Sequence, residues 1–173
     1  MASLMEDFID TLRKEHAEYE VLLEMSKKKT PIIVKGDTDA LSKITEEESA
    51  VVDRITHLDK HRVEVLTDIA SVLNKDVNTL TVPDLIALLA RQPKEQGQLR
   101  EVYDLLKVTL TEMKRVNEQN GKLIELSLEM VQFDMNLIQA AKSGPETGDY
   151  NRLGGYQTGG AFGGGRGGFD AKQ

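Results

Sequence analysis

The chain has 173 residues, a formal net charge of -7 and a sequence pI near 5.1. This length suits one domain of ordinary size with an appendage, and the acidic balance argues against a general grip on nucleic-acid phosphates. The absence of cysteine excludes disulfides, thiolate catalysis and zinc–thiolate sites. The first residues show no signal-peptide pattern, and no apolar run approaches the roughly 20 residues of a membrane span. We therefore expect a cytoplasmic chain without membrane insertion.

The distribution of glycine divides the chain into two parts. Eleven of the 14 glycines lie in residues 144–168, so the composition changes sharply after Lys142. Residues 1–142 are rich in strong helix formers, with apolar residues repeating every three or four positions. Residues 143–173 cannot bury enough apolar surface to offset the entropy lost on ordering. The sequence predicts a helical body over residues 1–142 and a flexible, disordered Gly-rich tail over residues 143–173.

The first helix is predicted to begin near Ser3, a candidate N-cap. Pro31 should end or kink it, because proline has no backbone N–H to donate. Gly36 follows as a helix stop, and Asp37 or Thr38 can cap the next helix. The apolar positions of the first helix are Leu4, Phe8, Leu12, Tyr19, Leu22 and Leu23.

The second helix is predicted to end near Asn74. A short helix then follows within the segment TLTVPDLIALLARQP, opened by a threonine cap with Pro83 in its first turn and closed before Pro93. This short helix should act as a connector or clamp. The apolar stripe of the second helix contains Leu41, Ile44, Val51, Ile55, Leu58, Val65, Ile69 and Leu73.

The longest predicted helix covers residues 94–142, with Gly97 and Gly121 as weak points. Unbroken, it would measure about 70 Å at 1.5 Å per residue, which does not fit a compact globule of this mass. No strand pattern competes with the helical one. We therefore predict an all-α fold, an elongated antiparallel three-helix bundle or coiled coil with one short extra helix.

The long helix carries two apolar stripes when residues are placed at 100° steps. The second stripe occurs only in the C-terminal half and points about 150° away from the first. The first stripe, the predicted core seam, contains Leu99, Tyr103, Leu106, Leu110, Met113, Asn117, Asn120, Ile124, Leu128, Val131, Met135 and Ile138. The second stripe contains Leu123, Leu126, Met130, Phe133 and Leu137.

Two explanations for the second stripe remain open at this point. The long helix can be central, with the other two helices packed on different sides of it. Alternatively, the stripe binds a partner helix, for which adaptable methionines such as Met130 and Met135 are suited. A homodimer would use the same stripe. Within the seam, Asn117 and Asn120 are expected to fix helix register through hydrogen bonds across the bundle.

The sequence offers little support for chemistry. His57 and His61 lie four residues apart and could meet one metal ion, but two ligands are too few and charged residues surround them. No nucleophile elbow, phosphate loop or dinucleotide-binding fingerprint occurs, and a narrow bundle provides few pockets for paired catalytic carboxylates. We predict no enzyme activity, no metal site and no cofactor.

Residues 116–133, VNEQNGKLIELSLEMVQF, and the tail segment DYNRLGG, together with an acidic, helical, cysteine-free body, resemble the FlgN family of flagellar type III export chaperones. Asn117, Asn120, Leu123 and Ile124 are similar to that family's Asn-x-x-Asn-x-x-Leu pattern in the last long helix. The resemblance implies a chaperone that binds the C-terminal helical region of hook-filament junction, or hook-associated, proteins in the cytoplasm. Such a chaperone prevents premature assembly of its client and delivers it to the export gate.

The same resemblance implies a role for a tyrosine shortly after the last helix. In the family, this residue helps to dock the chaperone on the cytoplasmic domain of the membrane export gate. Tyr150 is the best positional match and Tyr156 is a substitute. The glycine-rich middle of the tail departs from the shorter tails of the family.

Two other readings belong to different functional classes. The chain could be a structural coiled-coil adaptor that uses the second stripe to self-associate. It could also bind RNA through the tail, whose Arg-Gly-Gly unit is interleaved with aromatic residues. However, the three cationic residues of the tail, Arg152, Arg166 and Lys172, are offset by Glu146, Asp149 and Asp170. We therefore expect no nucleic-acid partner.

Overall fold

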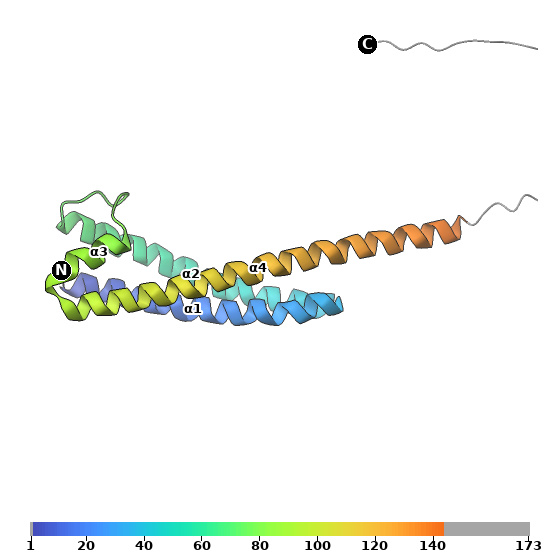
Figure 1. The fold of residues 1–173 in the computed structure, drawn as a ribbon, viewed down its shortest axis with the longest axis horizontal. Helices are drawn as coiled ribbons and strands as arrows, with labels where there is room; N and C mark the ends of the chain where they lie inside the picture. Colours follow the sequence, from blue (N-terminus) through green and yellow to red (C-terminus); the bar gives the residue numbers. More distant parts are fainter. Residues whose placement is uncertain (1, 144–173) are drawn as a thin grey trace, which may run out of the picture. The chain divides into compact units, whose positions relative to one another are not determined.

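The computed structural model describes residues 2–143, and these residues contain helices and no strand. The all-α prediction is confirmed. Figure 1 shows the element order, which is α1 (Ala2–Lys35), α2 (Thr38–Val72), α3 (Val82–Leu88), a 3₁₀ turn (Leu89–Arg91) and α4 (Pro93–Lys142). The chain divides into two compact units, Met1–Met135 and Asn136–Gln173. The described part of the second unit is the end of α4 together with Ser143.

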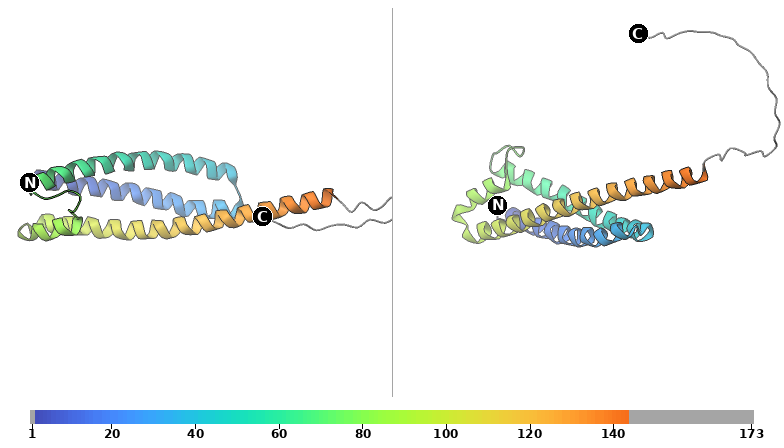
Figure 2. Two further views of the ribbon diagram at one scale, coloured as in Figure 1. Left: turned by 90° about the horizontal axis from the view of Figure 1, so that it is seen from above. Right: turned by 45° about the vertical axis from the view of Figure 1, so that its right-hand side comes forward.

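Helix α1 is the common neighbour of α2 and α4 (Figure 2). Its ion pairs with α2 show that these two helices are antiparallel, because Lys29 pairs with Glu48 at 2.8 Å and Glu18 pairs with Arg54 at 2.9 Å. Along α4 the numbering rises in the same direction as along α1. The Nε2 atom of His16 lies 3.0 Å from Oγ1 of Thr109. Thr30, which comes later in α1, contacts Asn120, which comes later in α4.

The turn between α1 and α2 follows from a glycine and a cap. Gly36 has φ of 68° and its N–H donates to the carbonyl of Ile33, while the N–H of Asp37 donates to the carbonyl of Ile32. This is the left-handed C-terminal motif that glycine favours. The side chain of Asp37 accepts from the N–H of Ala40 at 3.0 Å and caps α2. The predicted stop and cap are both confirmed.

Pro31 does not end α1, contrary to one of the two expectations for it. The helix continues through Pro31 to Lys35, although proline supplies no N–H for the carbonyl of Lys27 one turn earlier. The last turn is held in place by Ile33, which is buried. Burial of this side chain and the hydrogen bonds around Gly36 offset the missing bond.

The later boundaries also agree with the sequence. Helix α2 ends at Val72, and Asn74 has φ of 52° just beyond it. Thr81 caps α3 in a reciprocal capping box with Asp84, with Pro83 in the first turn. Helix α4 is continuous through both of its glycines.

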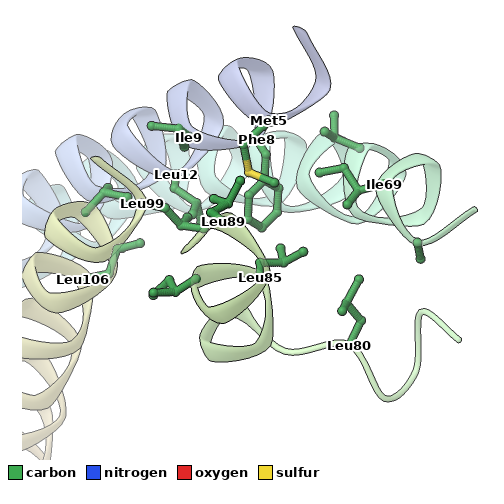
Figure 3. Packing of buried hydrophobic residues seen from close by; sticks show 14 residues of the cluster. Met5, Phe8, Ile9, Leu12, Ile69, Leu80, Leu85, Leu89, Leu99 and Leu106 are labelled. Atoms are coloured by element: carbon green, nitrogen blue, oxygen red, sulfur yellow. The ribbon is translucent and has the colours of Figure 1, made fainter. Parts of the chain in front are cut away.

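The hydrophobic core lies where the N-terminal part of α1, the end of α2, α3 and the first part of α4 meet (Figure 3). Phe8, Ile69, Leu85 and Leu99 are completely inaccessible to solvent. The short helix α3 is therefore more than a connector, since it supplies part of this core. The buried cluster contains Met5, Phe8, Ile9, Leu12, Val65, Ile69, Ala70, Leu80, Leu85, Ile86, Leu89, Leu99, Val102 and Leu106.

Candidate functional site

The most unusual surface of the first unit is the stretch of α4 over residues 121–135, called here the bare segment. None of its residues is buried, although it is rich in apolar side chains. Soluble monomers rarely expose such a continuous apolar surface. Where one is exposed, it usually marks an interaction site. The exposed fractions range from 38% to 68% for Ile124, Leu126, Leu128, Met130, Val131, Phe133 and Met135.

The later part of the bare segment is uncovered because α1 does not extend that far. Asn120 of α4 contacts Thr30 and Ser26 of α1, at sequence separations of 90 and 94. The same separations place Lys35, the last residue of α1, beside residues about 125–129 of α4. The chain then turns at Gly36 into α2, which runs back along α1. Consequently, no α1 residue is available beside the later part of the bare segment.

Part of the predicted core seam is therefore wrong. Ile124, Leu128, Val131 and Met135 were expected in the core, and all four are exposed. Ile138, in the second unit, is exposed as well. The explanation in which two helices pack on different sides of α4 fails within residues 121–135, because none of these residues is buried. The period of apolar residues in a sequence does not show how far a neighbouring helix extends.

Most residues of the second predicted stripe lie on the surface. Leu126, Met130 and Phe133 are more than half exposed, whereas Leu123 is half-buried. Leu137 is exposed and belongs to the second unit. The spacing of three and four residues between these side chains is that of anchors for a partner helix. Whether they bind a partner remains a prediction.

Sequence reasoning identified only part of the row of α4 that faces α1. Val102, Thr109 and Val116 are buried, at intervals of seven residues. Together with neighbouring positions they alternate steps of three and four, which is the seam of a coiled coil. The polar residues in this row, such as Thr109 and Ser127, interrupt the apolar pattern by which a core row is recognised in a sequence. The row contains Leu99, Val102, Leu106, Thr109, Met113, Val116, Asn120, Leu123 and Ser127.

Asn120 links α4 to α1 near the end of their contact. Its side chain is only 4% exposed, its Nδ2 donates to the carbonyl of Ser26 at 2.8 Å, and its Oδ1 accepts from Oγ1 of Thr30 at 2.7 Å. Asn117 was expected beside it in the core but is exposed. The expected hydrogen bonds across helices are thus present for Asn120, and its role in setting register is a proposal.

Replacing Asn120 by alanine is expected to lower the free energy of unfolding by about 1–3 kcal/mol, because it leaves buried polar groups on α1 without partners. Gln119→Ala is the matched control, because this neighbouring amide side chain is exposed on another side of α4, and it should change the free energy by less than about 0.5 kcal/mol. Urea denaturation followed by circular dichroism measures both. Equal losses in the two variants would contradict the assigned role of Asn120.

Glu15 and Arg62 form a charged pair between α1 and α2. Nε of Arg62 donates to Oε1 of Glu15 at 3.0 Å, and the same guanidinium also binds Asp59. Glu15 is almost fully covered. Burial raises the pKa of the Glu15 carboxyl above its ordinary value, and the attraction of Arg62 offsets this only in part. Burial likewise raises the pKa of the neighbouring Tyr19.

Glu15→Gln should reveal this pKa shift as a pH dependence of stability. A carboxyl whose pKa is raised by folding costs the native state stability as the pH rises through and above its unfolded value, near 4.5. The unfolding free energy of the variant minus that of the wild type is therefore expected to increase as the pH is raised from 4 to 7. Denaturation curves at each pH measure it, and a difference that falls with pH contradicts the sign.

Two of the three histidines, His16 and His61, contact side chains of other helices. Nε2 of His61 lies 3.1 Å from Oδ1 of Asp7 on α1, while His57 is exposed. In the part of the chain from residue 2 to residue 143, no group of three or more His, Asp or Glu side chains is arranged to hold a metal ion. Tyr150 and Tyr156, predicted to dock on the export gate, lie outside the described residues.

Comparison with known proteins decides the family. The family model described as "FlgN protein" matches residues 1–158. The chain belongs to the FlgN family. FlgN proteins are flagellar export chaperones, so the suspected resemblance is confirmed and this general class applies to the chain.

A relative of this FlgN protein is "Uncharacterized protein YvyG" of Bacillus subtilis (strain 168). The two are 28% identical over 130 residues, which cover 75% of this chain and 78% of the relative. No solved structure matches the chain.

No helix within residues 2–143 combines the length and the apolar character that crossing a membrane requires.

Proposed function

We propose that this FlgN protein binds the C-terminal helical region of hook-filament junction proteins in the cytoplasm. By covering that region it prevents premature assembly of the client and delivers it to the flagellar export gate. The observation that carries the proposal is the bare segment of α4, which offers exposed apolar side chains over several helical turns. Covering such a surface with a partner helix removes apolar area from water on both sides.

The anchors in the proposal are Leu126, Met130 and Phe133. They follow one another at intervals of four and three residues, so they line one side of α4. Each is more than half exposed, and each therefore has apolar surface left to bury. The unbranched side chain of Met130 can adjust to different client surfaces. Leu123 and Leu137 extend the same row in the sequence.

Docking on the cytoplasmic domain of the export gate is assigned to the tail, with Tyr150 as the principal residue and Tyr156 as its substitute. This assignment rests on the family pattern alone. Separate sites for client and gate would allow the chaperone to hold its cargo while it is presented to the export apparatus.

Binding to a defined client region tests the proposal. The purified chain is mixed with a hook-filament junction protein from the same organism, either complete or lacking its C-terminal helical region, and each mixture is examined by size-exclusion chromatography with light scattering. A complex of defined stoichiometry is expected only with the complete protein. Equal binding to both forms would contradict the proposed binding region. Self-association without any binding of the complete client would favour the adaptor reading.

A further inference from the structure

A second surface, separate from the client anchors, lies in a groove between α2 and α4 with α1 as its floor. The groove has a volume of about 520 Å³, and its apolar lining includes Tyr19, Tyr103, Leu106 and Leu110. Both tyrosines are half-buried and Leu110 is exposed. The α4 wall from Tyr103 to Lys114 is about 16 Å long, or three helical turns. We call this feature the tyrosine groove.

The charged side chains of the tyrosine groove are mainly cationic. Lys107 and Lys114 line its α4 wall and do not belong to the ion-paired lysines of the described part of the chain. Arg62, on the α2 side, binds Glu15 and Asp59 through two of its five N–H donors. Its side chain remains 30% exposed. A helix that occupies this groove should therefore carry apolar residues flanked by carboxylates.

The bare segment of α4 has this chemistry. Ile124 and Leu128 are exposed apolar residues on the α4 face that also carries Tyr103, Leu106 and Leu110, within about 60° of one another at 100° per residue. Two exposed glutamates, Glu118 and Glu125, flank this face. A second copy of the chain thus brings a matching acidic, apolar helix.

The spacing of the charges indicates the relative direction of the two copies. Lys107 and Lys114 are seven residues apart, and so are Glu118 and Glu125. All four lie on the same side of the apolar face, within about 40° of one another at 100° per residue. When two identical helices pack antiparallel, residues on the same side face each other. Lys107 then lies beside Glu125 of the second copy, and Lys114 beside Glu118.

Gly121 lies on the same face and helps the two helices approach. A Cβ atom added at Gly121 would meet nothing within 4 Å in the chain itself, so the missing side chain is not required by the packing of a single copy. Without a side chain at this position, a second α4 can come closer. The register defined by the charges also places Ile124 and Leu128 of one copy beside the tyrosine groove of the other.

From this complementarity we propose that the free chain forms a two-fold symmetric dimer. Antiparallel α4 helices pair in it, and Ile124 and Leu128 of each copy enter the tyrosine groove of the other. The interface is isologous, so each contact occurs twice. It uses the side of α4 that carries Leu128, whereas the client anchors Met130 and Phe133 lie on another side. The dimer therefore does not depend on the proposed client binding.

Sedimentation equilibrium of the purified full-length chain over a concentration series tests the dimer. The wild type is expected to dimerise, and Leu128→Glu to raise the dissociation constant at least tenfold. Phe133→Glu is the matched control, because it adds the same charge at an equally exposed position outside the interface, and should leave the constant within about threefold. Circular dichroism checks that each variant keeps its helix content.

A charge exchange tests the pairing itself. Lys107→Glu with Lys114→Glu should weaken the dimer at least tenfold, and adding Glu118→Lys and Glu125→Lys to the same chain should restore it to within about threefold. The net charge of the fourfold variant equals that of the wild type.

A wild-type chain that stays monomeric overturns the proposal, as do equal effects of Leu128→Glu and Phe133→Glu or a failed rescue. If Leu128→Glu weakens client binding in a monomeric chain, the groove belongs to the client instead.

Discussion

The double variant Met130→Glu, Phe133→Glu is expected to lose at least about 100-fold in affinity for a hook-filament junction protein. Both side chains are more than 60% exposed in the free chain, so each can bury apolar surface when a partner helix covers it. Burying such a side chain contributes about 1.5–3 kcal/mol, and a tenfold change in affinity corresponds to about 1.4 kcal/mol. The introduced carboxylates add a desolvation cost in the complex. Isothermal titration calorimetry measures the loss.

This loss should occur without damage to the fold, because neither side chain belongs to the core. The melting temperature and helix content are expected to match those of the wild type. The control is Val52→Glu with Val63→Glu, which adds the same charge at two exposed apolar positions of α2 and should retain binding. Unchanged client affinity in the Met130 and Phe133 variant, or equal losses in the control, would remove these residues from the client site.

The second large effect concerns stability, and the chain provides its own control. Phe8 is 0% exposed within the core, whereas Phe133 is 62% exposed. Phe8→Ala is expected to lower the free energy of unfolding by about 3–5 kcal/mol, because the lost transfer energy adds to the cost of the cavity. Phe133→Ala should change it by less than about 0.5 kcal/mol. Chemical denaturation of both variants measures the difference.

The same pair of variants separates folding from binding. Phe133→Ala is expected to weaken client binding while it leaves stability intact. In Phe8→Ala, the fraction that remains folded should bind the client with the wild-type affinity. A large loss of stability in Phe133→Ala would mean that the bare segment is covered within the free chain, contrary to the structure.

Local features of the sequence were sufficient to predict the turn after α1 and the start of α3. Gly36 and Asp37 specify the first turn, and the pair Thr81 and Asp84 specifies the start of α3, because caps and turns depend on residues within one helical turn. Pro31 was harder to interpret. Its cost is local, but the burial of Ile33 beyond it is a tertiary effect that the local pattern does not contain.

The extent of the core could not be predicted from periodicity. Ile124 and Leu128 repeat with the same period as Leu99 and Leu106, yet only the latter two are buried. Leu99 and Leu106 pack in the core formed with α2 and α3, and this core does not extend along α4 to Ile124 and Leu128. The sequence pattern also could not separate the two asparagines. Asn117 and Asn120 point about 60° apart on α4, and only Asn120 reaches α1.

For the candidate site, the sequence showed which residues form one row of α4, but not which other residues are exposed or lie nearby in the fold. It identified Leu126, Met130 and Phe133 as one row, and the structure shows that this row is exposed. It did not reveal that Ile124 and Leu128 are exposed too, nor that the tyrosine groove brings α1, α2 and α4 together. Such a groove depends on residues far apart in the chain, for which no local pattern exists.

Co-purification from the native cytoplasm tests the central claim most directly. The full-length chain and the Met130→Glu, Phe133→Glu variant are each expressed with an affinity tag in the source bacterium, and the proteins recovered with them are identified by mass spectrometry. Hook-filament junction proteins are expected with the wild type and should be lost with the variant. Recovery of no such protein with the wild type, or equal recovery with both, would contradict the account.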